Sequence, residues 1–374
     1  MENNIGLNEL LSTFLPASGE DWVNAATPEA GGKNPLEALN WQKSGLSGLP
    51  YYDSSNTPEG PFSLAPSANG FLGARAWRNL PKVKVLAEAE ANKKALNYLA
   101  AGAEGIVFEL TNSTVSLDIL LANIEWGYCT VGFVCDLVSE NFADELIRYI
   151  NSNASGASTF QGFVLQKTYP HHPQVLHKFI HTLSSHEKIK CLGISSDEKD
   201  ADEEISDLLA KAVATINQLN VSENPSALQQ IFFTTTISTD FFIEIAKLKV
   251  LRLLWHNILL AYGVEHAQAQ TTVIHAWSNA WVNEAFEPHG NMLKATTAGL
   301  AAILGGCSSV TLIPSDETDD RLARIAINVS HVLREESHIG KVADPTAGSF
   351  YLEQLIQQLT ERSWKKFLQK VNAA

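Results

Sequence analysis

Residues 305–353 read GGCSSVTLIPSDETDDRLARIAINVSHVLREESHIGKVADPTAGSFYLE, and this stretch decides the fold. A short β-branched run, Ser309–Ile313, is followed by a helical pattern over Thr318–Glu336. A second short run, Lys341–Ala343, is followed by a helical pattern over Gly348–Lys370. Short apolar runs that alternate with long helical patterns are typical of buried parallel strands joined by helices.

The same alternation extends back along the chain to about residue 100. Eight such pairs in series predict an α/β fold, a parallel (β/α)8 TIM barrel. An open, doubly wound sheet is the alternative, although no G-x-G-x-x-G follows a strand. The expected strands are residues 104–110, 130–135, 162–165, 189–194, 231–235, 271–276, 309–313 and 341–343.

Residues 1–70 differ from the rest because they are rich in Pro, Gly, Ser and Asn. Turn-forming runs such as TPEAGGKNP predict an extended N-terminal arm with one or two short helices, followed by a barrel over residues 71–374. The arm must bury its apolar residues against its own barrel or against a partner subunit, and the sequence favours neither. These residues are Leu10, Phe14, Leu15, Trp22, Leu36, Leu39 and Trp41.

Composition excludes several classes of protein. The net charge of −14 and the pI near 5.2 argue against a surface for nucleic acid or for an anionic membrane. No apolar run is long enough to span a bilayer and no basic signal region opens the chain, so a cytoplasmic protein is expected. The four cysteines form no CxxC pair and lie in apolar runs, which predicts buried thiols and no metal site; they are Cys129, Cys135, Cys191 and Cys307.

In a (β/α)8 barrel the reactive groups lie at the carboxyl ends of the strands. His275 and Asp344 are the obvious titratable groups at the expected strand ends. His275 fits either a hydrogen-bonded core residue or a ligand-facing residue, and Asp344 is expected to cap the helix that follows. His171 and His172, flanked by prolines, predict a surface turn. The mouth of the barrel, which these strand ends form, contains no paired carboxylates and no Ser–His–Asp arrangement.

Several motifs resemble the methylmalonyl-CoA mutase family. The family's D-P-x-A-G-S-[YF]-Y block matches Asp344–Tyr351, and its R-I-A-x-N motif matches Arg324–Asn328. The run FFIEIAK at Phe241–Lys247 and the run LAAG at Leu99–Gly102 match two further motifs. The resemblance covers roughly residues 10–367 and implies a barrel that serves the cobalamin-dependent isomerisation of acyl-CoA thioesters.

The departures fall on positions that catalytic members of that family use. A tyrosine that closes over the radical site, a Tyr–His pair, and Arg, His, Gln and Asn residues of the mouth are all replaced. Without such buried polar groups, an enzyme loses orders of magnitude in its discrimination between substrates. His275 is retained, and with Asn291 it forms the candidate residual pocket. The replacements are Lys82, Ser195, Ser238, Val273, Trp277, Thr311 and Ile313.

The family's cobalt-ligating motif, D-x-H-x-x-G, does not occur in these 374 residues, so we expect no cobalamin-binding domain and no cofactor bound by this chain. The resemblance implies a non-catalytic small subunit that scaffolds a large subunit bearing adenosylcobalamin, as a heterodimer. A homodimer is the alternative assembly. The complex would interconvert methylmalonyl-CoA and succinyl-CoA.

Two other functions stay open. The chain is alternatively the catalytic barrel of a split cobalamin-dependent acyl-CoA mutase with altered acyl specificity. The third hypothesis is a relict acyl-CoA binder in which Trp277 fills the space of the CoA chain, and it predicts a closed central channel.

Overall fold

The computed structural model describes residues 17–373 apart from 57–63, 65, 67, 71, 113, 137–140, 154–159, 168–172, 184–187, 220–226, 267–270 and 280–287. The arm residues Leu10, Phe14 and Leu15, and the pair His171 and His172, lie outside the described residues. Across the described part of the chain, no helix combines the length and the apolar content that crossing a bilayer requires.

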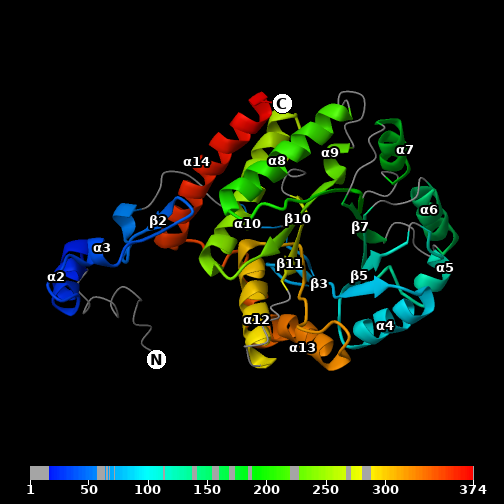
Figure 1. Ribbon diagram of the computed structural model, residues 1–374, viewed down its shortest axis with the longest axis horizontal. Coiled ribbons are helices and arrows are strands. Elements are labelled where there is room, and N and C mark those ends of the chain that lie inside the picture. The colour runs from blue at the N-terminus through cyan, green and yellow to red at the C-terminus, as the bar shows by residue number, and fades with distance from the viewer. Residues whose placement is uncertain are drawn as a thin grey trace, which may run out of the picture.

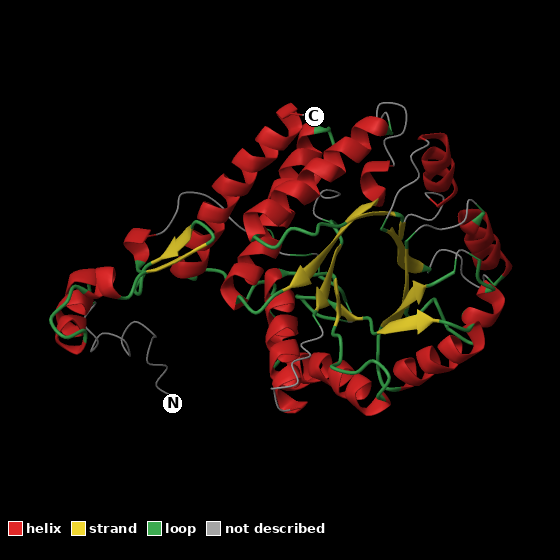
Figure 2. Cartoon of the chain, in the orientation of Figure 1, coloured by secondary structure: helices red, strands yellow, loops and turns green. Residues whose placement is uncertain are grey.

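Parallel strands form a closed ring that helices surround (Figure 2). The strand segments fall into two five-stranded sheets, ordered β3-β12-β11-β10-β9 and β4-β5-β6-β7-β8. The segments are β3 (Arg78–Asn79), β4 (Lys82–Val85), β5 (Gly105–Leu110), β6 (Thr130–Cys135), β7 (Gln161–Gln166), β8 (Ile189–Lys190), β9 (Leu192–Ile194), β10 (Ile231–Ile237), β11 (Ile274–Ser278) and β12 (Ser309–Thr311).

Two extended segments belong to both sheets and close the ring. Leu80 N donates to Val310 O (2.9 Å) and Val107 N donates to Pro81 O (3.0 Å), so residues 78–85 pair with β12 on one side and β5 on the other. Residues 189–194 likewise pair with β7 through β8 and with β10 through β9. The ten segments therefore form eight parallel strands, and the predicted (β/α)8 barrel is confirmed.

One expected strand is wrong. Residues 339–341 form a short 3₁₀ turn, η4 (Ile339–Lys341), whose Gly340 O accepts from Arg75 N (3.2 Å). The first barrel strand is instead residues 78–85, which the expected list lacks. Pro81 supplies no N–H donor and interrupts that strand, so the segment does not read as a continuous apolar run.

The helices pack outside the strands. They are α4 (Glu88–Ala100), α5 (Leu117–Leu120), α6 (Phe142–Ser152), α7 (Pro173–Leu183), α8 (Ala201–Gln218), α9 (Ala227–Gln230), α10 (Phe241–Ala261), α12 (Pro288–Gly305), α13 (Asp320–His331) and α14 (Phe350–Ala373). A π-helical turn, η3 (Val332–Glu336), continues α13. The last helix, α14, lies against α8 and α10 as an outer layer (Figure 1).

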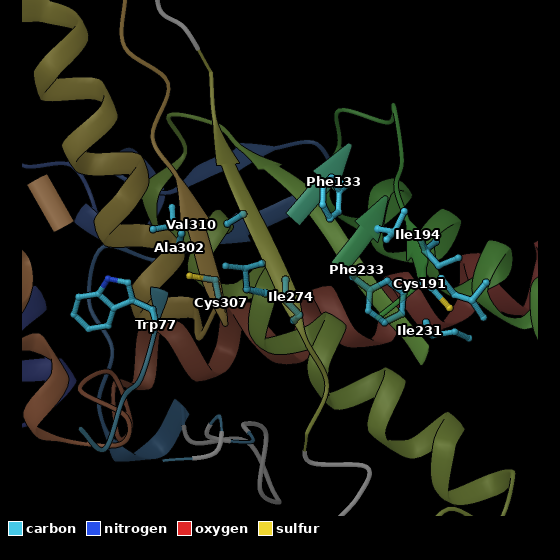
Figure 3. Packing of buried hydrophobic residues seen from close by; sticks show 14 of the residues in the cluster. Trp77, Phe133, Cys191, Ile194, Ile231, Phe233, Ile274, Ala302, Cys307 and Val310 are labelled. Carbon is cyan, nitrogen blue, oxygen red and sulfur yellow. The ribbon is translucent and has the colours of Figure 1, made fainter. Parts of the chain in front are cut away.

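The main core lies between the strands and these helices. Figure 3 shows Ile274 of β11, Val310 of β12 and Cys307 gathered beside Ala302 of α12. All four cysteines are buried, as predicted. Burial raises the pKa of the Cys129 thiol to about 11, so that thiol is inert at neutral pH.

The described part of the arm has two regions. At its tip, α2 (Gly19–Glu29) and α3 (Pro35–Ala38) lie away from the barrel (Figure 1), and Trp22 stacks on Tyr51 with ring centroids 5.1 Å apart. Nearer the barrel, β1 (Trp41–Lys43) and β2 (Leu46–Gly48) form an antiparallel hairpin that packs on α14. A 3₁₀ turn, η1 (Ser54–Asn56), follows.

Candidate functional site: the barrel lumen and mouth

Apolar side chains from several strands form a second cluster inside the barrel wall. Strand residues alternate between the two faces of the barrel wall. On β5, Ile106 and Phe108 face the helices in the main core, and Val107 belongs to a separate cluster, here called the inner cluster. Its members are Leu80, Val107, Val134, Phe163, Leu165 and Phe232. Val273 and Trp277, two of the candidate site positions named from the sequence, pack against this cluster.

His275 is a fully buried core residue with both ring nitrogens in use. Its Nδ1 lies 2.7 Å from Ser309 Oγ, and its Nε2 lies 3.2 Å from Thr311 Oγ1. The Thr311 hydroxyl donates to the Leu80 carbonyl, so it accepts from His275 Nε2–H, and Nδ1 accepts from Ser309. Burial lowers the pKa of His275 to about 3, so the imidazole is neutral and does not serve as an acid at neutral pH.

The Trp277 indole lies beside that imidazole. The His275 and Trp277 ring centroids are 4.5 Å apart with an interplanar angle of 83°, and Phe163 flanks His275 at 5.1 Å. Trp277 Nε1 donates to Thr234 Oγ1 (2.6 Å) across the β10–β11 pair. The hydrogen bond and the edge-to-face contact fix the indole over the inner cluster.

Lys82 forms ion pairs. Its Nζ is 3.2 Å from Glu317 Oε2 and 3.5 Å from Glu109 Oε2, and its side chain is largely shielded from solvent. Lys94 Nζ of α4 also donates to the Glu317 carbonyl (2.8 Å). These contacts join the first strand to β5 and to the loop after β12.

The other predicted positions lie around the mouth. Ser195 follows β9 and is half-buried. Ser238 N donates to Glu244 Oε1 (2.9 Å), and Ile313 N donates to Ser278 Oγ (2.8 Å). Asn291 and Ile313 line a shallow apolar groove between α12 and α13, and the lining of that groove does not include His275.

Asp344 does not lie at the mouth, because the segment before it is not a strand. Its carboxylate accepts from Lys249 Nζ (2.6 Å) and lies 3.3 Å from Arg75 Nη2. Arg75 precedes β3 and donates to the carbonyls of Ile303 and Leu304 at the end of α12, which places Asp344 at the amino ends of the strands. Asp344 also accepts from the backbone of Thr346, which lies before the start of α14, so the predicted cap is wrong.

A buried triad that the sequence motifs did not reveal lies near the end of β10. Lys247 Nζ of α10 lies 2.8 Å from Glu204 Oε2 and 2.6 Å from Glu244 Oε2, and it donates to Thr236 O (2.9 Å). The Thr235 hydroxyl donates to Glu204. Desolvation raises the pKa of Glu204 above its usual value although Lys247 opposes the shift. A Glu followed three residues later by Lys, inside an apolar helix directly after a strand, was the available signal.

Known proteins resemble this chain. A family model described as Methylmalonyl-CoA mutase matches residues 178–374. A methylmalonyl-CoA mutase small subunit from Porphyromonas gingivalis is 25% identical over 96% of this chain and 64% of its own length. The small subunit from Streptomyces virginiae is 38% identical over 38% of this chain and 23% of its own length. The chain thus spans less than two thirds of the length of these relatives.

Solved structures resemble the chain more distantly. Dihydropteroate synthase from Thermus thermophilus is 14% identical with a TM-score of 0.39, over 70% of this chain and 95% of that chain. The enzyme from Yersinia pestis is 12% identical with a TM-score of 0.38, over 72% and 99%.

Proposed function

Because the chain belongs to the methylmalonyl-CoA mutase family, we propose that it is a non-catalytic small subunit that scaffolds a large, catalytic subunit. Adenosylcobalamin would be held by that large subunit. The complex would interconvert methylmalonyl-CoA and succinyl-CoA, and this chain would supply a folded surface rather than reacting groups. The names of its relatives, small subunits of methylmalonyl-CoA mutase, support the assignment as a small subunit.

The inner cluster and the buried His275 carry the proposal. A thioester substrate needs space along the barrel and polar groups that recognise its acyl end. Here the space above the inner cluster holds Trp277, and the retained His275 is neutral, 0% exposed and engaged at both nitrogens. A buried imidazole in this state also does not fit a cobalt ligand, because a ligating nitrogen must be free of other partners. Among the described residues we therefore assign no group to the chemical step.

Exposed apolar side chains along the arm support the presence of a partner. Leu39 is 56% exposed and Leu49 is 41% exposed, and Trp22 and Leu36 are only partly covered by the arm itself. Apolar side chains that protrude from the arm gain free energy when a second protein covers them. A heterodimer places the large subunit against this tip, and a homodimer would place a second copy there.

Co-purification and assay test the proposal together. The chain would be co-expressed with the large mutase subunit from the same source, and each chain and the complex would be assayed for methylmalonyl-CoA isomerisation with adenosylcobalamin. We expect a stable complex, activity that requires the large subunit, and an inactive isolated chain. Turnover of any acyl-CoA by this chain with a separate cobalamin protein would refute the proposal and establish the split-mutase alternative.

A matched pair of variants tests the arm tip. Leu39→Asp puts a charge on the protruding surface, and Val342→Asp puts one on an equally exposed apolar residue near η4. We expect the first to weaken co-purification at least about tenfold, as for an apolar contact at the centre of an interface. The second should leave it unchanged. Equal effects of the two variants on co-purification would show that the arm is not part of the interface.

A further inference from the structure

The arm is anchored through a tight hairpin turn. The strap, defined here as residues 41–48, reverses direction at Ser44 and Gly45, whose φ angles are +49° and +77°. Two consecutive residues at positive φ form the turn type that fits the twist of a two-residue hairpin. Glycine adopts this conformation freely, but serine does so at a cost. The side chain at position 44 therefore has a role that offsets its backbone strain.

That role is a contact with the barrel. Ser44 Oγ donates to Asp200 Oδ1 (2.6 Å), and Lys43 Nζ donates to Asp240 Oδ1 (2.5 Å) and Oδ2 (2.6 Å). Asp200 and Asp240 are the residues that immediately precede α8 and α10. The tip of the strap thus lies against the start of two neighbouring barrel helices.

Neither carboxylate caps the helix that it precedes. Aspartate in this position normally accepts a hydrogen bond from the second or third backbone N–H of its own helix. Within the described residues, neither Asp200 nor Asp240 makes that bond, and each instead accepts from the strap. By contrast, Ser18 and Asp319 do cap their own helices, α2 and α13.

We propose that the strap is a releasable attachment whose two anchors change partners. In the docked state Asp200 and Asp240 hold Ser44 and Lys43. In the released state the same carboxylates turn inward and cap α8 and α10, so lifting the strap leaves neither of them without hydrogen bonds. Each recovered cap favours release by about fivefold. The strap therefore controls where the arm tip points, whatever the function of the chain.

Other contacts favour the docked state. Leu46 is 2% exposed in the main core, and Gln358 of α14 exchanges two hydrogen bonds with the backbone of Ser47 (3.0 and 3.1 Å). Arg362 Nη2 donates to Ser44 O (3.1 Å) and also pairs with Asp202. Docking is thus the resting state, and loss of the two anchors should shift the equilibrium without unfolding the barrel.

Hydrogen–deuterium exchange on the full chain tests this device. The variant Lys43→Met/Ser44→Gly removes both anchor groups and relieves the backbone strain at position 44, so the hairpin itself stays favourable. We expect amides of residues 41–48 to exchange about tenfold faster, since each partly exposed polar contact is weak. We also expect the first-turn amides of α8 and α10, at residues 202–203 and 242–243, to exchange about fivefold more slowly.

The slower exchange at the helix starts is the decisive readout, because a merely structural contact would not produce it. Asp240→Asn tests the same exchange of partners without introducing a glycine. Asparagine caps a helix as well as aspartate but forms no ion pair with Lys43, so the first-turn amides of α10 should again exchange more slowly. Lys178→Met is the matched control, since Lys178 forms an exposed ion pair with Asp144 (2.9 Å) away from the strap. It should change neither set of amides.

The contrary results are equally specific. Unchanged exchange at residues 41–48 in the double variant would show that Leu46 and Gln358 alone hold the strap. Faster exchange at the helix starts would show that the carboxylates do not turn inward. A melting temperature of the double variant more than about 2 °C below that of the wild type would show that the docked strap is required for the stability of the barrel. Each result would overturn the proposal.

Discussion

Replacing Lys247 with methionine should destabilise the protein more than any exposed lysine substitution. Lys247 Nζ lies 2.8 Å from Glu204 and 2.6 Å from Glu244, and its side chain is 3% exposed. Methionine has a similar volume, so it creates little cavity but leaves two carboxylates buried without their cation. Breaking a buried pair in this way costs about 3–5 kcal/mol. For a chain of this length that corresponds to a melting temperature lower by about 5 °C.

The loss should depend on pH with a definite sign. Burial already raises the pKa of Glu204, and removing Lys247 removes a charge that opposes the rise. A carboxyl group whose folded-state pKa is raised stabilises the fold below its unfolded pKa, and that stabilisation is lost as the pH rises through the folded pKa. The Lys247→Met variant should therefore approach the wild type as the pH is lowered from 8 towards 5.

Urea unfolding at pH 8 and pH 5 measures both effects. The matched control is Lys211→Met, which removes an exposed ion pair with Asp207 (2.8 Å) and should cost at most about 1 kcal/mol. The double variant Glu204→Gln/Lys247→Met should recover part of the loss, because a neutral amide replaces one uncompensated charge. The reasoning is refuted if Lys247→Met is no less stable than Lys211→Met, or if the double variant recovers nothing.

Three further changes have defined outcomes. Trp277→Ala should lower the free energy of unfolding by about 3 kcal/mol in urea, since it empties the space over the inner cluster. Asp202→Asn should lose stability at pH 7, and the loss should shrink as the pH falls below about 4. Burial raises the pKa of Asp202, but hydrogen bonds from Lys366 and Arg362 outweigh this and hold that pKa below its usual value, so acid removes the contribution. Gly162→Ala should cost about 3 kcal/mol in thermal unfolding, because the added methyl would overlap the Val131 carbonyl oxygen in the adjacent strand.

The sequence predicted the barrel because local signals repeat. Runs such as residues 130–135 and 189–194 are largely apolar on both faces, and both form strands. The seven expected strands that exist share this pattern. The remaining strand, residues 78–85, carries Pro81 and pairs with β12 more than 220 residues away, so no local window contains its evidence.

The site shows the same division. The sequence alone was enough to name Lys82, Val273, Trp277 and His275 as candidate site positions. The sequence does not show which group a hydroxyl donates its hydrogen bond to. Thr311 donates to Leu80 O and thereby fixes the tautomer of His275, and this depends on three strands meeting in the lumen.

The sequence by itself determined seven of the eight barrel strands and the family, because these depend on residue identity and local spacing. Only the tertiary structure decided which segment closes the barrel and that Asp344 lies at the opposite end from His275. It also decided that Glu204 and Glu244 share Lys247, and that two helix-starting aspartates hold the arm. Those features are contacts between distant segments, and their energies depend on burial and on partners that pattern and spacing do not reveal.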